Sequence, residues 1–112
     1  MAQWLYRIVP SRPEMVAAAT PDEQRIVGEH FAYLVALRDR GVLVIAGRTQ
    51  ETEGTFGITI FEADDEPAAR EVMNSDPAVA AGVFVASLHP YRIAVARDRP
   101  EVWRVRLPCS RR

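Results

Sequence analysis

The stretch TPDEQRIVGEHFAYLVALRDRG, residues 20–41, decides how this chain folds, because it has the pattern of one long amphipathic helix. Thr20 and Glu23 have the spacing of a capping box, and Gly41 can take the left-handed conformation that ends a helix. At about 100° per residue, an apolar stripe follows one side of the segment through Ile26, Val27, His30, Phe31, Tyr33, Leu34 and Leu37. We therefore expect a helix over residues 21–40 whose stripe packs on a sheet.

His30 lies in the middle of this stripe, so its imidazole should face the interior rather than bulk water. A buried imidazole needs a hydrogen-bond partner for at least one ring nitrogen. Two interpretations follow. His30 is a core histidine that a backbone carbonyl satisfies, or it is a general acid or base in a pocket between helix and sheet, oriented by a nearby carboxylate.

The rest of the chain alternates strands and loops around a second helix. Apolar alternation and turn residues predict strands over residues 3–9, 42–46, 56–61 and 83–96, a loop or short turn at 11–19, and a hairpin loop at 50–54. A second helix is expected over residues 65–74, with Asp64 as its N-cap and Ala69, Val72 and Met73 buried. The order β-α-β-β-α-β is that of an α+β, ferredoxin-like fold, in which two helices cover one face of an antiparallel sheet.

The second and last of these strands, 42–46 and 83–96, are apolar on both faces. The helices can cover one face of the sheet, which leaves a large apolar surface on the other. Such a surface usually meets a second copy of the same chain. We therefore expect a homodimer with two sheets packed face to face.

Composition excludes several classes of chemistry. The 112 residues, 48% of them hydrophobic, are enough for one domain with a real core. The chain contains no lysine, which excludes Schiff-base chemistry and P-loop phosphate binding. With Cys109 as its one cysteine it has no internal disulfide, and it has no apolar run of about 18 residues. A cytoplasmic location and no contact with a membrane are expected.

Charge is distributed unevenly along the chain. Residues 97–112 hold six arginines and two acidic residues, giving +4, whereas residues 1–96 hold eight arginines and thirteen acidic residues, giving −5. Six arginines spread over this length make no compact basic patch. We expect residues 97–112 to be a basic C-terminal tail, either solvated or added as a strand to a partner subunit, and we expect no nucleic-acid binding.

A few further side chains are candidates for a site. Tyr6, Tyr33 and Arg48 could line a pocket, and Arg48 would suit an anionic or phenolate substrate, unless it is an exposed turn cation. His89 is expected at the surface or at a dimer edge. With two histidines, one tail cysteine and neither H-x-x-x-H nor C-x-x-C, we expect no metal site, and no cofactor is expected.

Several short motifs, taken in order, resemble the YCII-related (YciI-like) family. They are HFAYL at 30–34, GVL at 41–43, AG at 46–47, NSDPAVAAGV at 74–83 and LHPYR at 88–92. The resemblance covers roughly residues 3–96 and assigns 1–96 to one domain. It implies ferredoxin-like dimers that form an α/β barrel, as in muconolactone isomerase, with a histidine–aspartate pair in a pocket. One branch of the family is associated with dehydrohalogenation of chlorinated hydroquinones. Arg48 departs from the family pattern, because many members have proline there.

The positions that match the family's pair are His30 and Asp76. An aspartate before Pro77 is also an ordinary N-cap of a helical turn. The two roles are compatible, because one carboxylate oxygen can cap while the other accepts a hydrogen bond from the imidazole and fixes its tautomer. Ser75 is adjacent and is a candidate for the pocket, but it has no nucleophile elbow or oxyanion loop.

Two functions remain open at this point. In the first, the chain is a small cofactor-free enzyme, and His30 removes or delivers a proton on a small cyclic or aromatic metabolite, driving isomerisation or elimination. In the second, it is a non-catalytic dimer that binds a small ligand or regulates another process.

Overall fold

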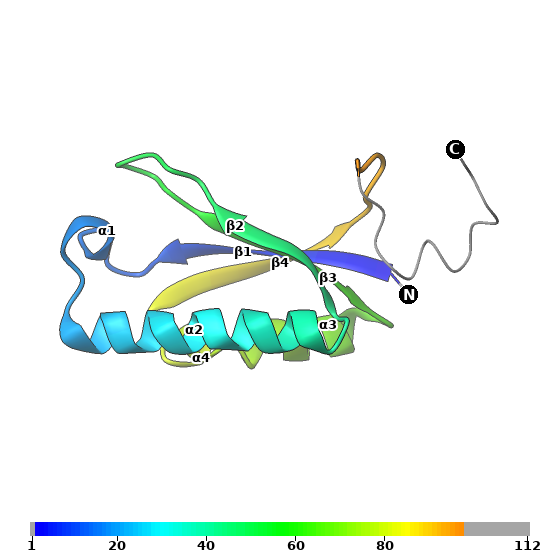
Figure 1. Ribbon diagram of the computed structural model, residues 1–112, viewed down its shortest axis with the longest axis horizontal. Helices are drawn as coiled ribbons and strands as arrows, with labels where there is room; N and C mark the ends of the chain where they lie inside the picture. Colours follow the sequence, from blue (N-terminus) through cyan, green and yellow to red (C-terminus); the bar gives the residue numbers. More distant parts are fainter. Residues whose placement is uncertain (1, 98–112) are drawn as a thin grey trace.

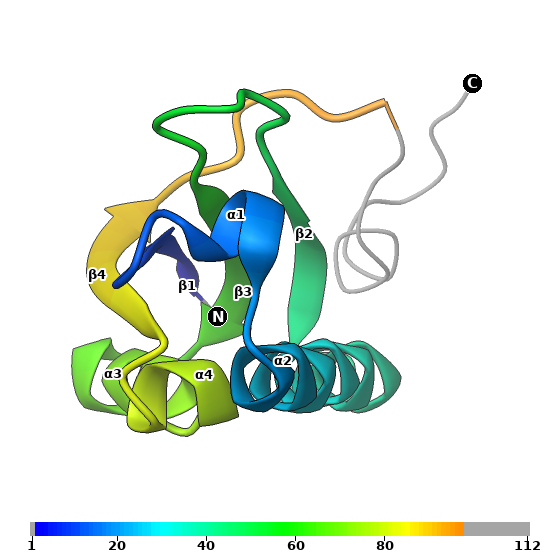
Figure 2. The same ribbon diagram turned by 90° about the vertical axis from the view of Figure 1, so that its left-hand side faces the viewer.

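The computed structural model describes residues 2–97, which form a four-stranded antiparallel sheet with three helices on one face and a short helix beyond the end of the first strand (Figures 1 and 2). The strands are β1 (Ala2–Pro10), β2 (Leu43–Arg48), β3 (Gly57–Ala63) and β4 (Phe84–Tyr91), arranged in the order β2-β3-β1-β4. The helices are α1 (Met15–Ala18), α2 (Pro21–Asp39), α3 (Glu66–Asn74) and α4 (Pro77–Ala80). This is the predicted α+β, ferredoxin-like fold, with two short helices, α1 and α4, added to it.

Both ends of α2 form as the sequence predicts. The Thr20 hydroxyl accepts the Glu23 amide at 3.1 Å, and the Glu23 carboxylate accepts the Thr20 amide at 2.9 Å, which completes the capping box. At the other end Gly41 has a φ of 77°, and the Val42 amide donates to the Leu37 carbonyl at 2.9 Å. This left-handed termination turns the chain directly into β2.

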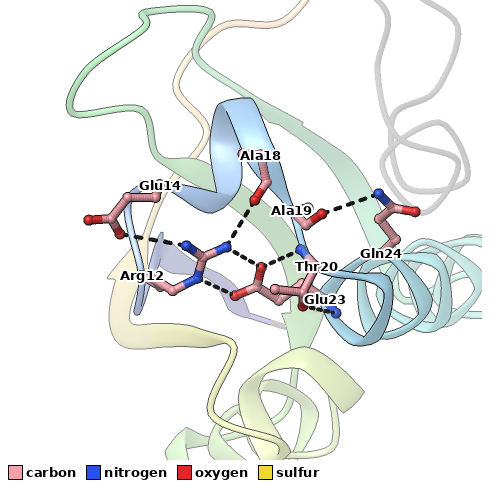
Figure 3. Close-up of polar contacts among 7 residues, drawn as sticks. All are labelled: Arg12, Glu14, Ala18, Ala19, Thr20, Glu23 and Gln24. Atoms are coloured by element: carbon pink, nitrogen blue, oxygen red, sulfur yellow. Dashed lines mark hydrogen bonds and ion pairs between the residues drawn. The ribbon is translucent and has the colours of Figure 1, made fainter.

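Arg12 fastens the segment that carries α1 to the start of α2 (Figure 3). Its guanidinium donates twice to the Glu23 carboxylate, at 2.7 and 2.9 Å, and once to the Ala18 carbonyl at 3.0 Å. Glu23 therefore closes the capping box and anchors the loop at the same time. The pKa of Glu23 is lowered to about 2, first by the Arg12 hydrogen bonds and then by the Thr20 amide.

The core lies between the sheet and the helices. Strand alternation turns Trp4, Tyr6 and Ile8 toward the helices, and Tyr6 packs edge-on against Phe61 with ring centroids 5.8 Å apart. From the helices, the core includes Ala69 and Met73 of α3, with Val72 partly buried against it, while α2 buries Leu37 completely. Phe31 of the predicted stripe differs, because 67% of its surface stays exposed.

Several predicted boundaries differ from the structure; β2 and β3, for example, end two residues later than expected. The N-cap of α3 is Asp65, not Asp64, and its side chain accepts the Ala68 amide at 3.0 Å. With Asp64 as the cap, Pro67 would occupy the third helical position, where it offers the cap no amide. The last strand ends at Tyr91 rather than at residue 96. Tyr91 pairs with Gln3, and β1 begins at Ala2, so the residues after Tyr91 have almost no β1 backbone left to pair with.

The predicted tail, residues 97–112, lies outside the described residues except for Arg97, so the division into a domain and a tail stays a prediction. Within residues 2–97, no helix has both the length and the apolar character needed to cross a membrane. The same part of the chain contains no cluster of three or more histidine, cysteine, aspartate or glutamate side chains placed to hold a metal ion.

We predict that Glu23→Gln lowers the melting temperature at neutral pH, and that this difference from the wild type disappears in acid. A carboxyl group with a lowered pKa stabilises the fold above its ordinary pKa, here 4.5, and that contribution is lost as the pH falls through about 2. Thermal melts followed by circular dichroism over this range measure the difference. Glu14→Gln is the control, because Glu14 lies 4.0 Å from Arg12 and is exposed. An unchanged difference down to the lowest pH would contradict the prediction.

Candidate active site

A cavity of about 680 Å³ lies between α2 and the sheet, and the segment of α1 borders it. Its volume is in the range of small-molecule sites. The wall is mostly apolar and includes Met15 of α1, Leu34 of α2 and Ala46 of β2. Its polar groups include His30, Thr59 and Gln24, and Arg38 and Arg48 bring positive charge. No carboxylate occurs among the described residues that line it.

His30 links this cavity to a buried carboxylate. Its Nδ1 lies 2.7 Å from Oδ2 of Asp76, a hydrogen bond between two residues that are 46 positions apart. The His30 side chain is 12% exposed, whereas Asp76 is completely buried. The ring of Phe84 meets the imidazole edge-on, at 5.2 Å between centroids and 85° between planes. The imidazole is thus held from two sides at the cavity wall.

Asp76 is held in place by the start of α4. It is the N-cap of that helix, with extended backbone, and its Oδ1 accepts the Ala78 amide at 3.0 Å. Pro77 follows at the first helical position, where its missing amide costs nothing. One oxygen therefore caps the helix while the other faces His30, which is the arrangement that the sequence suggested.

A third donor, Tyr6, completes the environment of the carboxylate. The Tyr6 hydroxyl donates to Oδ2 of Asp76 at 2.7 Å, so this oxygen accepts hydrogen bonds from both Tyr6 and His30. Burial, and next the negative charge of Asp76, raise the pKa of Tyr6 far above its ordinary value. The phenol accordingly stays protonated and remains a donor.

This arrangement determines what His30 can do chemically. Because Nδ1 is bonded to a carboxylate that accepts donors on both oxygens, the neutral imidazole carries its proton on Nδ1. The other ring nitrogen, Nε2, then has a free lone pair, and no described residue hydrogen-bonds to it. A proton accepted by Nε2 produces an imidazolium 2.7 Å from a negative charge, which stabilises it.

The remaining candidates occupy different places. Arg48 lines the cavity and has an exposed side chain. Tyr33 does not line it, and its hydroxyl donates to the Val72 carbonyl at 2.6 Å; burial, and then the charge of Asp76, raise its pKa. Ser75 is the exposed C-cap of α3. His89 is exposed on β4, 2.9 Å from the Ser87 hydroxyl.

Sequence reasoning missed two features of the site. Tyr6 was expected in the wall of a pocket, but it is completely buried and contacts Asp76 instead. The available signal was its place between Trp4 and Ile8 on the inward face, since a buried tyrosine hydroxyl needs a partner. The second feature is Arg38, which lies in the last turn of α2 and lines the cavity. The sequence indicates only that a positive charge is favourable at the C-terminal end of a helix.

Comparisons with solved structures give several neighbours, among them the following two proteins. The first is the 5-chloro-2-hydroxyhydroquinone dehydrochlorinase of Burkholderia phenoliruptrix AC1100 in complex with 2,5-dihydroxybenzoquinone. It is 20% identical with a TM-score of 0.60, and the match covers 84% of this chain and 96% of that one. The second is SnoaB, a cofactor-independent oxygenase from Streptomyces nogalater, at 11% identity and a TM-score of 0.47, covering 88% and 97%. A search of curated proteins found no match.

A comparison with family models assigns the chain directly. The model of the YCII-related domain matches residues 6–88. This range includes all of α2, α3 and α4, and it contains Tyr6, His30 and Asp76. The chain therefore belongs to the family of proteins with a YCII-related domain.

Proposed function

We propose that this protein is a small enzyme that uses His30 and Asp76, without a cofactor, to transfer protons on a small cyclic or aromatic metabolite. The observation that carries the proposal is the 2.7 Å contact between Nδ1 of His30 and the buried Asp76 carboxylate, at the wall of a cavity large enough for one ring system. A histidine with only a structural role would not need a buried carboxylate, because a backbone carbonyl can accept the hydrogen bond of its ring N–H.

The chemistry follows from the roles of the two groups. Nε2 of His30 removes a proton from a hydroxyl group or an activated carbon of the substrate. The electron pair left behind moves into the ring, and it either re-forms a double bond at another position or expels a leaving group such as chloride with its own electron pair. Asp76 stabilises the imidazolium, which then returns the proton to the product or to water.

The choice of test compound comes from the neighbour with the same fold. That protein is named for dehydrochlorination of 5-chloro-2-hydroxyhydroquinone, and its ligand is a dihydroxylated quinone. Both compounds are single rings with acidic hydroxyl groups. We infer that rings of this class are suitable first substrates for this chain.

His30→Gln should abolish most turnover and leave the protein folded. Chloride release from 5-chloro-2-hydroxyhydroquinone should fall by about 10²–10⁴-fold, the range of general acid–base catalysis. His89→Gln is the matched control, because His89 is exposed and does not line the cavity. A thermal melt on each variant accompanies the assay. Lost stability with unchanged turnover would reject the catalytic role. Ring binding without any turnover in the wild type would favour the ligand-binding alternative.

Arg48 is proposed to bind the substrate. It lines the cavity, and among the ion pairs of residues 2–97 none involves its guanidinium. Arg38, the other arginine of the wall, already lies 3.1 Å from the Asp39 carboxylate. With no acidic side chain among the described lining residues, the cavity favours an anion such as a phenolate.

Arg48→Gln should therefore weaken the binding of 2,5-dihydroxybenzoquinone. Losing one hydrogen bond to a charged group costs about 1.5–3 kcal/mol, which corresponds to roughly 10- to 100-fold in Kd. Isothermal titration calorimetry measures it, with Arg25→Gln as the control, because Arg25 pairs with Glu29 on the surface of α2. Equal affinity in Arg48→Gln and the wild type would remove Arg48 from the site.

A homodimer through the open face of the sheet is the proposed assembly. Ile45 pairs with Ile60 of β3, and Val85 pairs with Val9 of β1. Ile60 and Val9 are each next to an inward-facing residue of their strand, so they face outward. Ile45 and Val85 therefore also point away from the helices. They are 59% and 57% exposed, which is unusual for large apolar side chains on a sheet. A second copy packed there would cover both.

Light scattering at micromolar concentration should give twice the 12.5 kDa chain mass. The interface should bury about 1,600 Å² or more. The double variant Ile45→Glu/Val85→Glu should be monomeric, because it would bury four unpaired charges in each dimer, while Ala32→Glu on exposed α2 should remain dimeric. A monomeric wild type would contradict the proposal.

A further inference from the structure

The contact between Tyr6 and Asp76 connects the core of the protein to the His30–Asp76 pair. Tyr6 is completely buried in β1 and is not part of the cavity wall, so it cannot contact a bound ring. Its hydroxyl nevertheless donates to the one carboxylate oxygen that His30 also uses, with both distances 2.7 Å. Tyr6 thus lies behind the pair, on the side away from the cavity.

The two oxygens of Asp76 are both committed to donors. Oδ1 accepts the Ala78 amide, whose position α4 fixes, and Oδ2 accepts Tyr6. Because the Tyr6 hydroxyl donates to Oδ2, it favours the ionised carboxylate over the form with a proton on Oδ2. With Tyr6 in place, Asp76 is therefore an acceptor on both sides.

This matters when His30 is protonated. The pair then holds one proton on Nε2 and one between Nδ1 and Oδ2. The second proton can stay on Nδ1, giving an imidazolium beside a carboxylate, or move to Oδ2, giving a neutral imidazole beside a carboxylic acid. A donor on Oδ2 disfavours the second form.

We propose that Tyr6 is a positioning residue: by donating to Oδ2 of Asp76, it keeps the shared proton on Nδ1 of His30 and holds Asp76 as a carboxylate. Tyr6 acts through Asp76 and does not touch the substrate. The effect of Tyr6 on turnover rests on the proposed function, whereas its effect on the position of the proton between Nδ1 and Oδ2 does not.

Nuclear magnetic resonance on the intact, ligand-free protein tests the position of the proton. The chain has two histidines, so the His89→Gln background leaves one imidazole to observe. In the protonated state, the wild type should show a large one-bond N–H coupling at Nδ1 and a carboxylate ¹³C shift for Asp76. Tyr6→Phe should reduce that coupling and move the Asp76 carboxyl shift toward that of an acid.

Tyr33→Phe is the matched control. Tyr33 is also a partly buried tyrosine near the pair, but its hydroxyl donates to the Val72 carbonyl and not to Asp76. It should leave both signals unchanged. Identical signals in Tyr6→Phe and the wild type would overturn the proposal. So would equal changes in Tyr6→Phe and Tyr33→Phe.

A second measurement applies if Tyr6→Phe does not fold. Incorporation of 3-fluorotyrosine into Tyr33→Phe keeps the hydroxyl of Tyr6 and makes it a stronger donor. The shared proton should then move closer to Nδ1, opposite to the effect of Tyr6→Phe. A shift toward Asp76, or none, would contradict the positioning role.

Kinetics separate this inference from the function itself. On a substrate that the wild type turns over, Tyr6→Phe should lower kcat by about 10- to 100-fold, as for partners that orient metal-bound histidines, with little change in KM. If His30→Gln retains full turnover, the enzymatic proposal fails while the resonance result still stands. If His30→Gln is inactive and Tyr6→Phe has wild-type kcat and signals, the positioning role alone fails.

Discussion

One buried carboxylate joins the parts of this fold that lie far apart in the sequence. Asp76 accepts hydrogen bonds from β1 through Tyr6, from α2 through His30 and from its own helix through Ala78. Removing such a charge from water costs several kcal/mol, which well-placed donors must offset. Asp76 stabilises the start of α4 as its N-cap through Oδ1, and the hydrogen bond from His30 to Oδ2 connects the same carboxylate to the cavity wall.

The space between the sheet and the helices is filled under α3 and hollow under part of α2. The core cluster between the sheet and α3 includes Phe61 and Met73, so that side is filled. Beneath α2, the residues that line the cavity include Ala46, Gly47 and Gly57. A Cβ at Gly57 would lie 3.0 Å from Cγ1 of Ile8, so even alanine there would press on the wall. Small residues on β2 and β3 thus leave a cavity under α2, whereas large residues such as Phe61 and Met73 fill the corresponding space under α3.

The secondary structure and half of the site could be predicted from sequence because their signals are local. The capping box, the glycine after α2 and the aspartate before Pro77 each define backbone geometry within a few residues. The cap of α3 was misplaced by one residue, since two adjacent aspartates carry the same signal and only the missing amide of Pro67 separates them. The partner of Tyr6 is 70 residues away, and no local pattern encodes such a distance.

The charges around the cavity are arranged on two sides of the imidazole. Arg38 and Arg48 line the same space as His30, so two positive charges lie on the cavity side of the imidazole. Asp76 lies 2.7 Å from Nδ1 on the buried side, where it also accepts a hydrogen bond from Tyr6. A bound anion would neutralise the arginines from the front. In the proposed function, the arginines would select an anionic ring and the His30–Asp76 pair would act on it, so the two tasks belong to different groups around one cavity.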